Sequence, residues 1–357
     1  METSMGAVVC HGPRDYRFEQ VPIPALPSGG AVLRVEAVGI CASDVKCFQG
    51  APMFWGDASR AAYCEPPVVS GHEFIGIVEE IDGAAATRWR VQVGSRIAVE
   101  QIVPCGHCLY CRRDSFWLCD VHRIFGFKTS LPGAMGQYVA IPSGAHVYPM
   151  DGDVRPAHAA YTEPLACALH AVDRARLVEE DVVVVAGAGP IGLGMVAGAA
   201  RSGVRTIIAV DANEKRLEVA TRAGAHSTIN IAAGDPVARL AELTDGYGCD
   251  VYFEATGHPS AVPQGLQMLR KQGRFVEYSV FKEPVSADWT IIGDSKELTV
   301  LGAHLGPHQW PTAIDMIERG QVPLDHIVTH ELPLADYSHG LSLVAAGTNS
   351  IKVVLVP

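Results

Sequence analysis

Four cysteines stand close together, at Cys105, Cys108, Cys111 and Cys119, in the spacing C-x₂-C-x₂-C-x₇-C. Four thiolates can close a tetrahedral shell around zinc, and a closed shell leaves no position for a substrate. We therefore predict a structural zinc site in a lobe over residues 100–120. An iron–sulfur cluster is the alternative, because C-x₂-C-x₂-C also serves clusters. The chain has no second cysteine group and no Cys-Pro pair here, which favours zinc.

A second candidate metal site combines Cys41 with the neighbours His72 and Glu73. These are a soft, a borderline and a hard ligand. Three protein ligands with one open position are typical of catalytic rather than structural zinc. An isolated His-Glu pair is far more often a surface dipeptide, so the prediction depends on the cysteine lobe and on the motif described next.

A glycine-rich motif, G-x-G-x-x-G, runs from Gly187 through Ala188, Gly189, Pro190 and Ile191 to Gly192. An apolar strand over 182–186 precedes it, a helix of small residues over 191–200 follows, and a second strand over 206–210 ends at Asp211. Free N–H groups at such a helix start bind the pyrophosphate of a dinucleotide. The Asp211 carboxylate can accept both ribose hydroxyls, which favours NAD over NADP. A structural βαβ unit without a ligand is the alternative.

Further strands and helices alternate after Asp211. The expected elements are strands over 227–231, 250–254 and 273–280 and a helix over 236–243. This alternation predicts a doubly wound parallel sheet. Residues 5–40 read as strands, and the chain ends with a helix over 310–319 and a strand over 351–356.

Composition describes a globular protein with an ample core. The 357 residues are 48% hydrophobic and 19% charged, and the net charge of −11 disfavours a nucleic-acid partner. The N-terminus does not resemble a signal peptide, and the sequence has no apolar run that would cross a membrane. We expect a cytoplasmic protein without membrane or nucleic-acid partners.

Gly71-His72-Glu73, the cysteine lobe and the glycine motif, in this order, resemble the zinc-dependent medium-chain alcohol dehydrogenase family, nearest its sorbitol (polyol) and threonine dehydrogenase branch. The resemblance implies an α/β protein with a GroES-like β-rich catalytic domain and a Rossmann cofactor domain. The implied boundaries are 1–162 with 300–357 for the first and 163–299 for the second. It also implies NAD and two zinc ions per subunit, one catalytic and one structural.

Carried over residue by residue, the resemblance assigns the catalytic zinc to Cys41, His72 and Glu73. Glu163, in a Glu-Pro pair, would be a fourth, exchangeable ligand or would reach zinc through water. Ser43 would relay the substrate proton, and Asp44 would orient His72.

The resemblance also assigns cofactor contacts to Arg216, Thr256 and Ala303. Residues 82–93 are longer and less regular than in the family, and two positions depart from its pattern. Lys46 stands where relatives often carry a relay histidine, and His304-Leu305-Gly306 replaces an Arg-aromatic pair of sorbitol dehydrogenases.

These features predict oxidation of a secondary hydroxyl of a polyol to a ketose. Acidic groups around one metal suit a polyhydroxylated substrate, and the aromatic-rich loop over 47–67 favours a short tetritol or pentitol. Sorbitol, L-threonine or a diol are alternatives, and a non-catalytic zinc- and dinucleotide-binding subunit is a remote one. By analogy with relatives, the strand near 298–303 would join subunits into a homodimer or homotetramer.

Overall fold

The computed structural model describes residues 3–151 and 153–357, which form two compact units. The first comprises residues up to Glu163, 310–318 and 328–357. The second comprises residues 164–309 and 319–327, so residues 300–309 group with the second unit.

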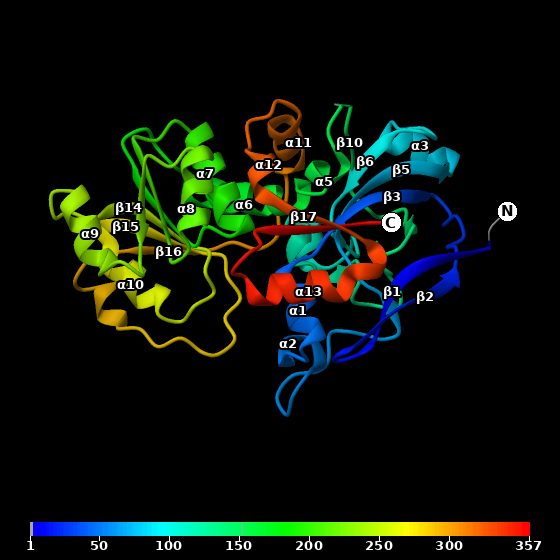
Figure 1. Cartoon of the computed structure of the whole chain (residues 1–357), viewed down its shortest axis with the longest axis horizontal. Coiled ribbons are helices and arrows are strands. Elements are labelled where there is room, and N and C mark those ends of the chain that lie inside the picture. The colour runs from blue at the N-terminus through cyan, green and yellow to red at the C-terminus, as the bar shows by residue number, and fades with distance from the viewer. Residues whose placement is uncertain (1–2, 152) are drawn as a thin grey trace. The chain divides into compact units, whose positions relative to one another are not determined.

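The first unit is built on a seven-stranded sheet in which β3 is the most connected strand (Figure 1). β3 pairs with β5, β9 and β18, all antiparallel. The sheet consists of β10 (Val147–Pro149), β6 (Arg96–Val99), β5 (Glu73–Ile81), β3 (Ala31–Gly39), β18 (Lys352–Val356) and β17 (Val328–Pro333) in spatial order, with β9 (Tyr138–Ile141) against β3. The last residues of the chain thus lie directly beside the strand that leads to Cys41.

A three-stranded sheet and several short helices complete this unit. The strands are β2 (Asp15–Pro22), β1 (Ser4–Gly12) and β4 (Val68–Val69), and the helices are α1 (Ala42–Phe48), α2 (Pro52–Trp55), α3 (Gly83–Trp89), α5 (Pro156–Ala159), α11 (Trp310–Glu318), η3 (Leu334–Asp336) and α13 (Tyr337–Ala346). Within the segment 82–93, residues Gly83–Trp89 form α3. Asp82 accepts the N–H of Ala84 and so caps α3.

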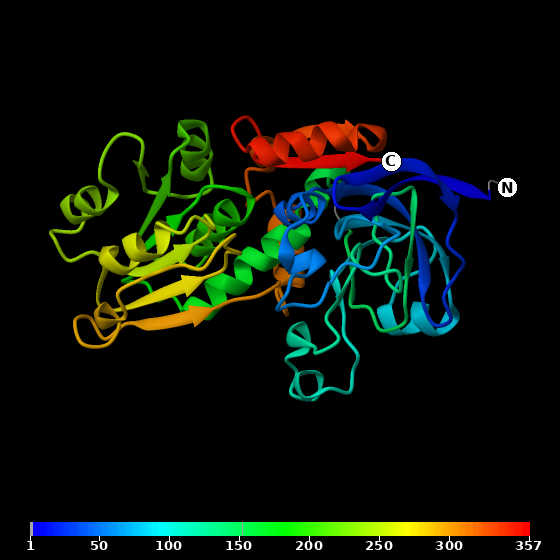
Figure 2. The ribbon, with the colours of Figure 1, turned by 90° about the horizontal axis from the view of Figure 1, so that it is seen from below.

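The four cysteines lie on a lobe that extends away from these sheets (Figure 2). Its neck is the two-stranded pair β7 (Ile102–Val103) and β8 (Arg123–Ile124), and it contains α4 (Leu109–Arg112) and the short helix η1 (Phe116–Leu118). Few apolar side chains stabilise it, because Leu109, Leu118 and Val121 are exposed. A cross-link through the cysteines would supply the order that packing does not.

The second unit is a six-stranded sheet with all neighbours parallel, which confirms the predicted doubly wound architecture. Its strands, in spatial order, are β13 (Ser227–Asn230), β12 (Thr206–Asp211), β11 (Val182–Ala186), β14 (Cys249–Glu254), β15 (Leu269–Glu277) and β16 (Thr299–Gly302). Its helices are α6 (Thr162–Ala175, which begins in the first unit), α7 (Pro190–Arg201), α8 (Glu214–Arg222), α9 (Pro236–Leu243), α10 (Ala261–Met268), η2 (Trp289–Ile291) and α12 (Leu324–Ile327). The central strand β11 is buried along its whole length, as its run of valines requires.

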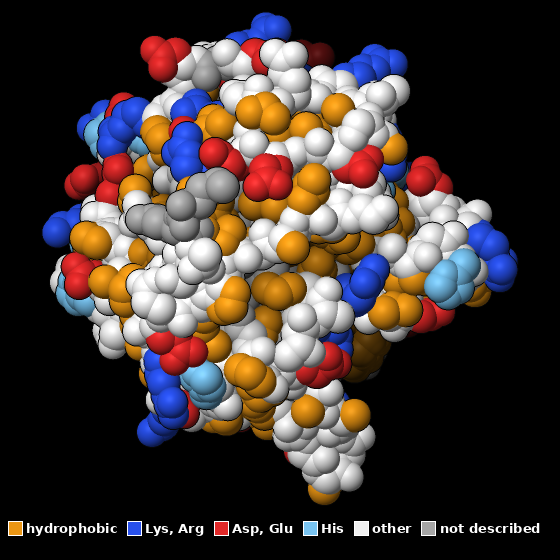
Figure 3. Space-filling model, turned by 90° about the vertical axis from the view of Figure 1, so that its right-hand side faces the viewer, with side chains coloured by type: hydrophobic (Ala, Val, Ile, Leu, Met, Phe, Trp, Pro, Cys, Tyr) orange, Lys and Arg blue, Asp and Glu red, His pale blue; other side chains and the backbone are white. Residues whose placement is uncertain are grey.

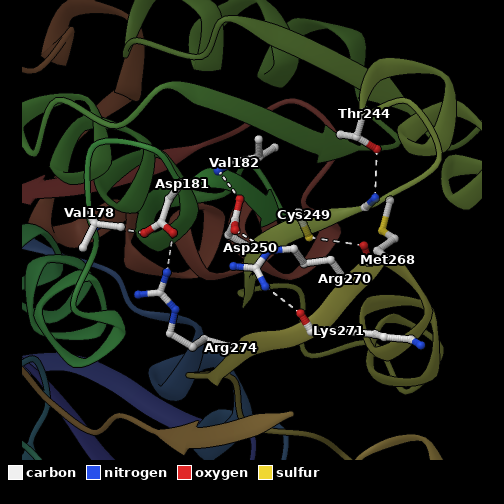
Figure 4. Close-up of polar contacts among 11 residues, drawn as sticks. Val178, Asp181, Val182, Thr244, Cys249, Asp250, Met268, Arg270, Lys271 and Arg274 are labelled. Atoms are coloured by element: carbon white, nitrogen blue, oxygen red, sulfur yellow. Dashed lines mark hydrogen bonds and ion pairs between the residues drawn. The ribbon is translucent and has the colours of Figure 1, made fainter. Parts of the chain in front are cut away.

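Two ion pairs tie the strands of this sheet together at the end remote from the glycine motif (Figure 4). Asp181, just before β11, pairs with Arg274 of β15, and Asp250 of β14 pairs with Arg270. Asp181 also accepts the N–H of Val178 at 2.8 Å. These contacts fix one end of the sheet, and the glycine motif lies at the opposite end.

Charged side chains of both signs are interspersed with apolar ones on the face shown in Figure 3. Within the residues that the structure describes, every helix is too short or too polar to cross a bilayer.

Candidate metal and cofactor sites

The three predicted catalytic ligands come together at one end of the seven-stranded sheet. Glu73 begins β5 and pairs with Gly39, the last residue of β3, so Cys41 leaves its strand beside His72 and Glu73. The sulfur of Cys41, a ring nitrogen of His72 and a carboxylate oxygen of Glu73 lie within 4.8 Å of one another. His72 and Glu73 are buried and Cys41 is half-buried, so the group faces solvent on one side only.

Asp44 contacts two of these ligands, Cys41 and His72. Its carboxylate accepts the N–H of Cys41 at 2.8 Å, and its other oxygen lies 3.6 Å from Nδ1 of His72. Burial works to lower the pKa of His72, but the negative charges of Asp44 and Cys41 outweigh it and raise that pKa to about 10. The site therefore attracts a positive charge at this ring. The Ser43 hydroxyl lies 3.5 Å from Nε2 of His72, beside the ring but at the limit of a hydrogen bond.

The donor set fits a zinc ion. Thiolate, imidazole and carboxylate are the ligands zinc takes, and three of them leave one position open. A metal cation at His72 would replace the proton that the buried acidic groups otherwise favour. Cys41, His72 and Glu73 could therefore hold a metal and still admit a substrate oxygen.

Glu163 stands at the start of α6 and is 6% exposed. It is not one of the three residues whose ligand atoms lie within 4.8 Å of one another, although its charge acts on His72. The amide of Gln101 donates a 2.5 Å hydrogen bond to Oε1 of Glu163, and the Gln101 side chain is fully buried. Gln101 was not among the predicted site residues, because the sequence offered no signal that a glutamine beside the lobe reaches Glu163.

An aromatic cluster covers His72. Phe127 lies 5.4 Å from the His72 ring, centroid to centroid, and stacks on Phe54 at 5.1 Å. Tyr63 completes the cluster at 5.8 Å from Phe127. Phe54 and Tyr63 belong to the loop expected to line the substrate mouth, whereas Phe127 was missed because it follows the cysteine lobe without any motif of its own.

The four lobe cysteines also converge, with all sulfurs within 4.8 Å of one another. The sulfurs of Cys105 and Cys111 are 3.9 Å apart, close to the roughly 3.8 Å that a tetrahedral site with bonds of about 2.3 Å requires. Main-chain N–H groups of Cys111 and Asp120 lower the pKa of Cys108 to about 6, which favours its thiolate. The lobe could hold a closed tetrathiolate metal ion.

The glycine motif forms the turn between β11 and α7. A Cβ on Gly192 would lie 1.7 Å from the carbonyl oxygen of Gly187, so only glycine fits there. Pro190 and Ile191 begin the helix, with Gly189 as its N-cap. Asp211, at the end of β12, accepts the N–H of Ala188 at 2.7 Å and thereby ties the motif to the next strand. This is the geometry of a phosphate-binding turn with an acid beside it.

The remaining predicted cofactor residues lie around the same edge of the sheet. Arg216 of α8 reaches within 3.9 Å of the position that a Cβ on Gly189 would occupy. Thr256 follows β14, where its N–H donates to Glu254 at 2.8 Å, and the N–H of Ala303 donates to the Glu277 carbonyl at 3.0 Å. The structure therefore gathers all of them at the carboxyl ends of the parallel strands.

The two departures from the family pattern have defined places. Lys46 lies in the last turn of α1, beyond Ser43 and Asp44. His304 to Gly306 follow β16, where the hydroxyl of Tyr278 donates to the Leu305 carbonyl at 3.3 Å.

Comparison with known proteins places this geometry in a family. Residues 27–152 match the alcohol dehydrogenase GroES-like domain, and residues 190–319 match the zinc-binding dehydrogenase domain. The chain is 55% identical over 353 residues to the erythritol/L-threitol dehydrogenase of Mycolicibacterium smegmatis, which covers 99% of this chain and 98% of the relative. The chain belongs to the zinc-dependent medium-chain alcohol dehydrogenase family. The predicted GroES-like and Rossmann fold is thereby confirmed.

Solved structures agree along the full length. A putative zinc-binding dehydrogenase from Sinorhizobium meliloti bound to NADP superposes with a TM-score of 0.90 at 29% identity and full coverage of both chains. An E. coli alcohol dehydrogenase complexed with NADH superposes with a TM-score of 0.86 at 26% identity, again with full coverage of both chains. As a member of this family the chain is an oxidoreductase, which contradicts the remote alternative of a non-catalytic subunit.

Proposed function

We propose that this dehydrogenase oxidises a secondary hydroxyl of a short polyol, a tetritol, to a ketose with NAD as hydride acceptor. The carrying observation is the 55% identity to an erythritol/L-threitol dehydrogenase across nearly the whole of both chains. The polar surroundings of Cys41, His72 and Glu73 agree with a substrate that carries several hydroxyls, since Glu163 and Gln101 add further hydrogen-bonding groups there.

Each residue at this site would have its own role in the reaction. Cys41, His72 and Glu73 would hold the catalytic zinc, which would supply Lewis acidity. Asp44 holds Cys41 and His72 in place, and the Ser43 hydroxyl beside His72 receives the substrate proton. Glu163 serves as an exchangeable ligand or as an acceptor for a second substrate hydroxyl. Phe127 and Phe54 shield the ring of His72 from water.

Cys105, Cys108, Cys111 and Cys119 would hold a second zinc, which would order the lobe. The motif from Gly187 to Gly192 would bind the pyrophosphate of the dinucleotide. Asp211 favours NAD, because a 2′-phosphate would meet its negative charge. The two structural relatives hold NADH and NADP respectively, so this preference rests on Asp211 itself.

We also propose a cytoplasmic homodimer or homotetramer. None of the ten cysteines, all of which lie in the part of the chain that the structure describes, forms a disulfide, as expected in a reducing compartment. The strand β16 lies at the edge of the six-stranded sheet with Val300 48% exposed, and an unpaired edge favours pairing with a second copy.

The test is NADH formation at alkaline pH with a panel of polyols. Erythritol and L-threitol should be turned over faster than sorbitol, with NAD preferred over NADP. L-threonine, 2,3-butanediol and a simple secondary alcohol serve as controls. Activity confined to L-threonine or to a diol would move the enzyme to another branch and refute the tetritol assignment.

A further inference from the structure

Lys352 is a buried lysine next to the proposed catalytic metal site. It begins β18 and is 1% exposed. Its ammonium group forms an ion pair with the carboxylate of Glu73 and donates a 3.0 Å hydrogen bond to the carbonyl of Ile40. Because Ile40 directly precedes Cys41, one ammonium group contacts both chain segments that carry the ligands Cys41 and Glu73.

The sheet is built to admit this contact. β18 pairs with β3 through Val354 and Gly39, and Gly39 in turn pairs with Glu73 of β5. A Cβ on Gly39 would lie 2.3 Å from Oε2 of Glu73 and 2.7 Å from Cε of Lys352. The lysine side chain therefore crosses the middle strand at the one position where a missing side chain leaves room.

The charges around the site explain why a lysine is tolerated there. Burying an ammonium ion without a partner would be strongly destabilising. The Glu73 carboxylate supplies that partner, and both side chains are buried.

We propose that Lys352 is a positioning residue for the catalytic metal, which fixes the Glu73 carboxylate and the segment before Cys41 in the arrangement that binds the ion. This inference rests on the proposed function, since it takes Cys41, His72 and Glu73 as the ligands. Lys352 contacts Oε2 of Glu73, so it would restrict how this carboxylate can turn toward the ion.

The experiment compares Lys352→Met with Lys296→Met in the full-length enzyme. Lys296 is the matched control: it donates to the main-chain carbonyls of Leu266, Gln267 and Leu269 in the second unit, apart from any proposed metal ligand. Zinc release is titrated with a chelator, and the visible absorption of the cobalt-substituted enzymes reports the ligand geometry.

Lys352→Met should bind one of its two zinc ions about 10–100-fold more weakly, as is typical when a group behind a metal ligand is lost. Its cobalt spectrum should also change, whereas Lys296→Met should match the wild type in both readouts. Retention of the lobe zinc and of NADH binding reports that the variant is folded. Lys352→Arg keeps the positive charge and should retain zinc better than Lys352→Met. This comparison distinguishes the effect of the charge at position 352 from the effect of side-chain packing.

Unchanged zinc affinity and an unchanged cobalt spectrum in Lys352→Met would overturn the inference. So would equal changes in both lysine variants, because Lys352 would then contribute to stability alone. The zinc titration uses no substrate, so its outcome does not depend on which polyol the enzyme oxidises. A wild-type enzyme that is inactive on every polyol would refute the proposed function, and the zinc affinity of Lys352→Met would still test the role of Lys352.

Discussion

Replacing Gln101 with Leu removes one buried hydrogen bond while nearly preserving the side-chain volume. The bond lost is the 2.5 Å contact from the Gln101 amide to Oε1 of Glu163. The main-chain hydrogen bond from Phe125 to the Gln101 carbonyl, at 3.0 Å, would remain, so the neck of the lobe is expected to keep its fold. The substitution therefore tests what the Gln101 amide contributes to the position of the Glu163 carboxylate.

The expected magnitude follows from the burial of both partners. A hydrogen bond to a charged group contributes about 1.5–3 kcal/mol, and the carboxylate left behind would be buried without this donor. If the amide orients Glu163 for the reaction, the whole of that energy appears in the barrier. We then expect kcat/KM to fall roughly 10–150-fold, at about 1.4 kcal/mol for each factor of ten. The melting temperature should fall by roughly 3–12 °C, at about 2–4 °C per kcal/mol for a unit of this size.

The assay is steady-state turnover of erythritol with NAD, in a double-mutant cycle with Glu163→Gln. Gln137→Leu is the control, because its amide oxygen accepts the N–H of Gly6 in the same unit without touching the site. In the Glu163→Gln background, Gln101→Leu should cost much less than in the wild type. Equal losses in both backgrounds, or wild-type turnover in Gln101→Leu, would refute the role of the amide.

Three further outcomes are expected. Cys105→Ser should lose one zinc equivalent and lower the melting temperature while leaving the NADH dissociation constant unchanged, as metal analysis and fluorescence titration would show; loss of both zinc ions would contradict separate sites. Asp211→Asn should weaken NAD binding about 10–150-fold, because a charged acceptor of the ribose hydroxyls contributes about 1.5–3 kcal/mol, and it should reduce the preference for NAD over NADP. An unchanged ratio of NAD to NADP affinity would show that Asp211 does not set this preference. Burial and the charge of Glu254 raise the pKa of Glu277 from 4.5 to about 7. The folded protein therefore favours the protonated carboxyl. The contribution of Glu277 to the free energy of unfolding is complete below about pH 4.5 and is lost as the pH rises through 7. The free energy of unfolding of Glu277→Gln, measured with denaturant, should accordingly depend less on pH over this range than that of the wild type. An equal pH dependence of the two proteins would count against a raised pKa of Glu277.

Features encoded within short segments were predictable from the sequence. The spacing of the four lobe cysteines and the strand-glycine-helix unit around Gly187 each carry their geometry locally. The strand over 182–186 was predicted with the bounds that the structure has, because a run of valines between Asp181 and a glycine turn has few other conformations.

Contacts between distant segments were not predictable. Lys352 lies 279 residues from Glu73 and meets it because β18 is inserted beside β3, a pairing that no local pattern specifies. Gln101 and Phe127 flank the lobe and touch Glu163 and His72 only because β7 and β8 close its neck. The sequence indicated the ligands, whereas the residues that hold them depend on the order of the strands.

The most direct test of the account is a comparison of Cys41→Ser with the wild type for turnover of erythritol with NAD, zinc content and NADH binding. We predict that Cys41→Ser loses one of two zinc ions and its turnover while the NADH dissociation constant stays the same. Turnover at the wild-type rate in a variant that has lost this zinc would contradict a catalytic metal at Cys41, His72 and Glu73, and with it the central claim.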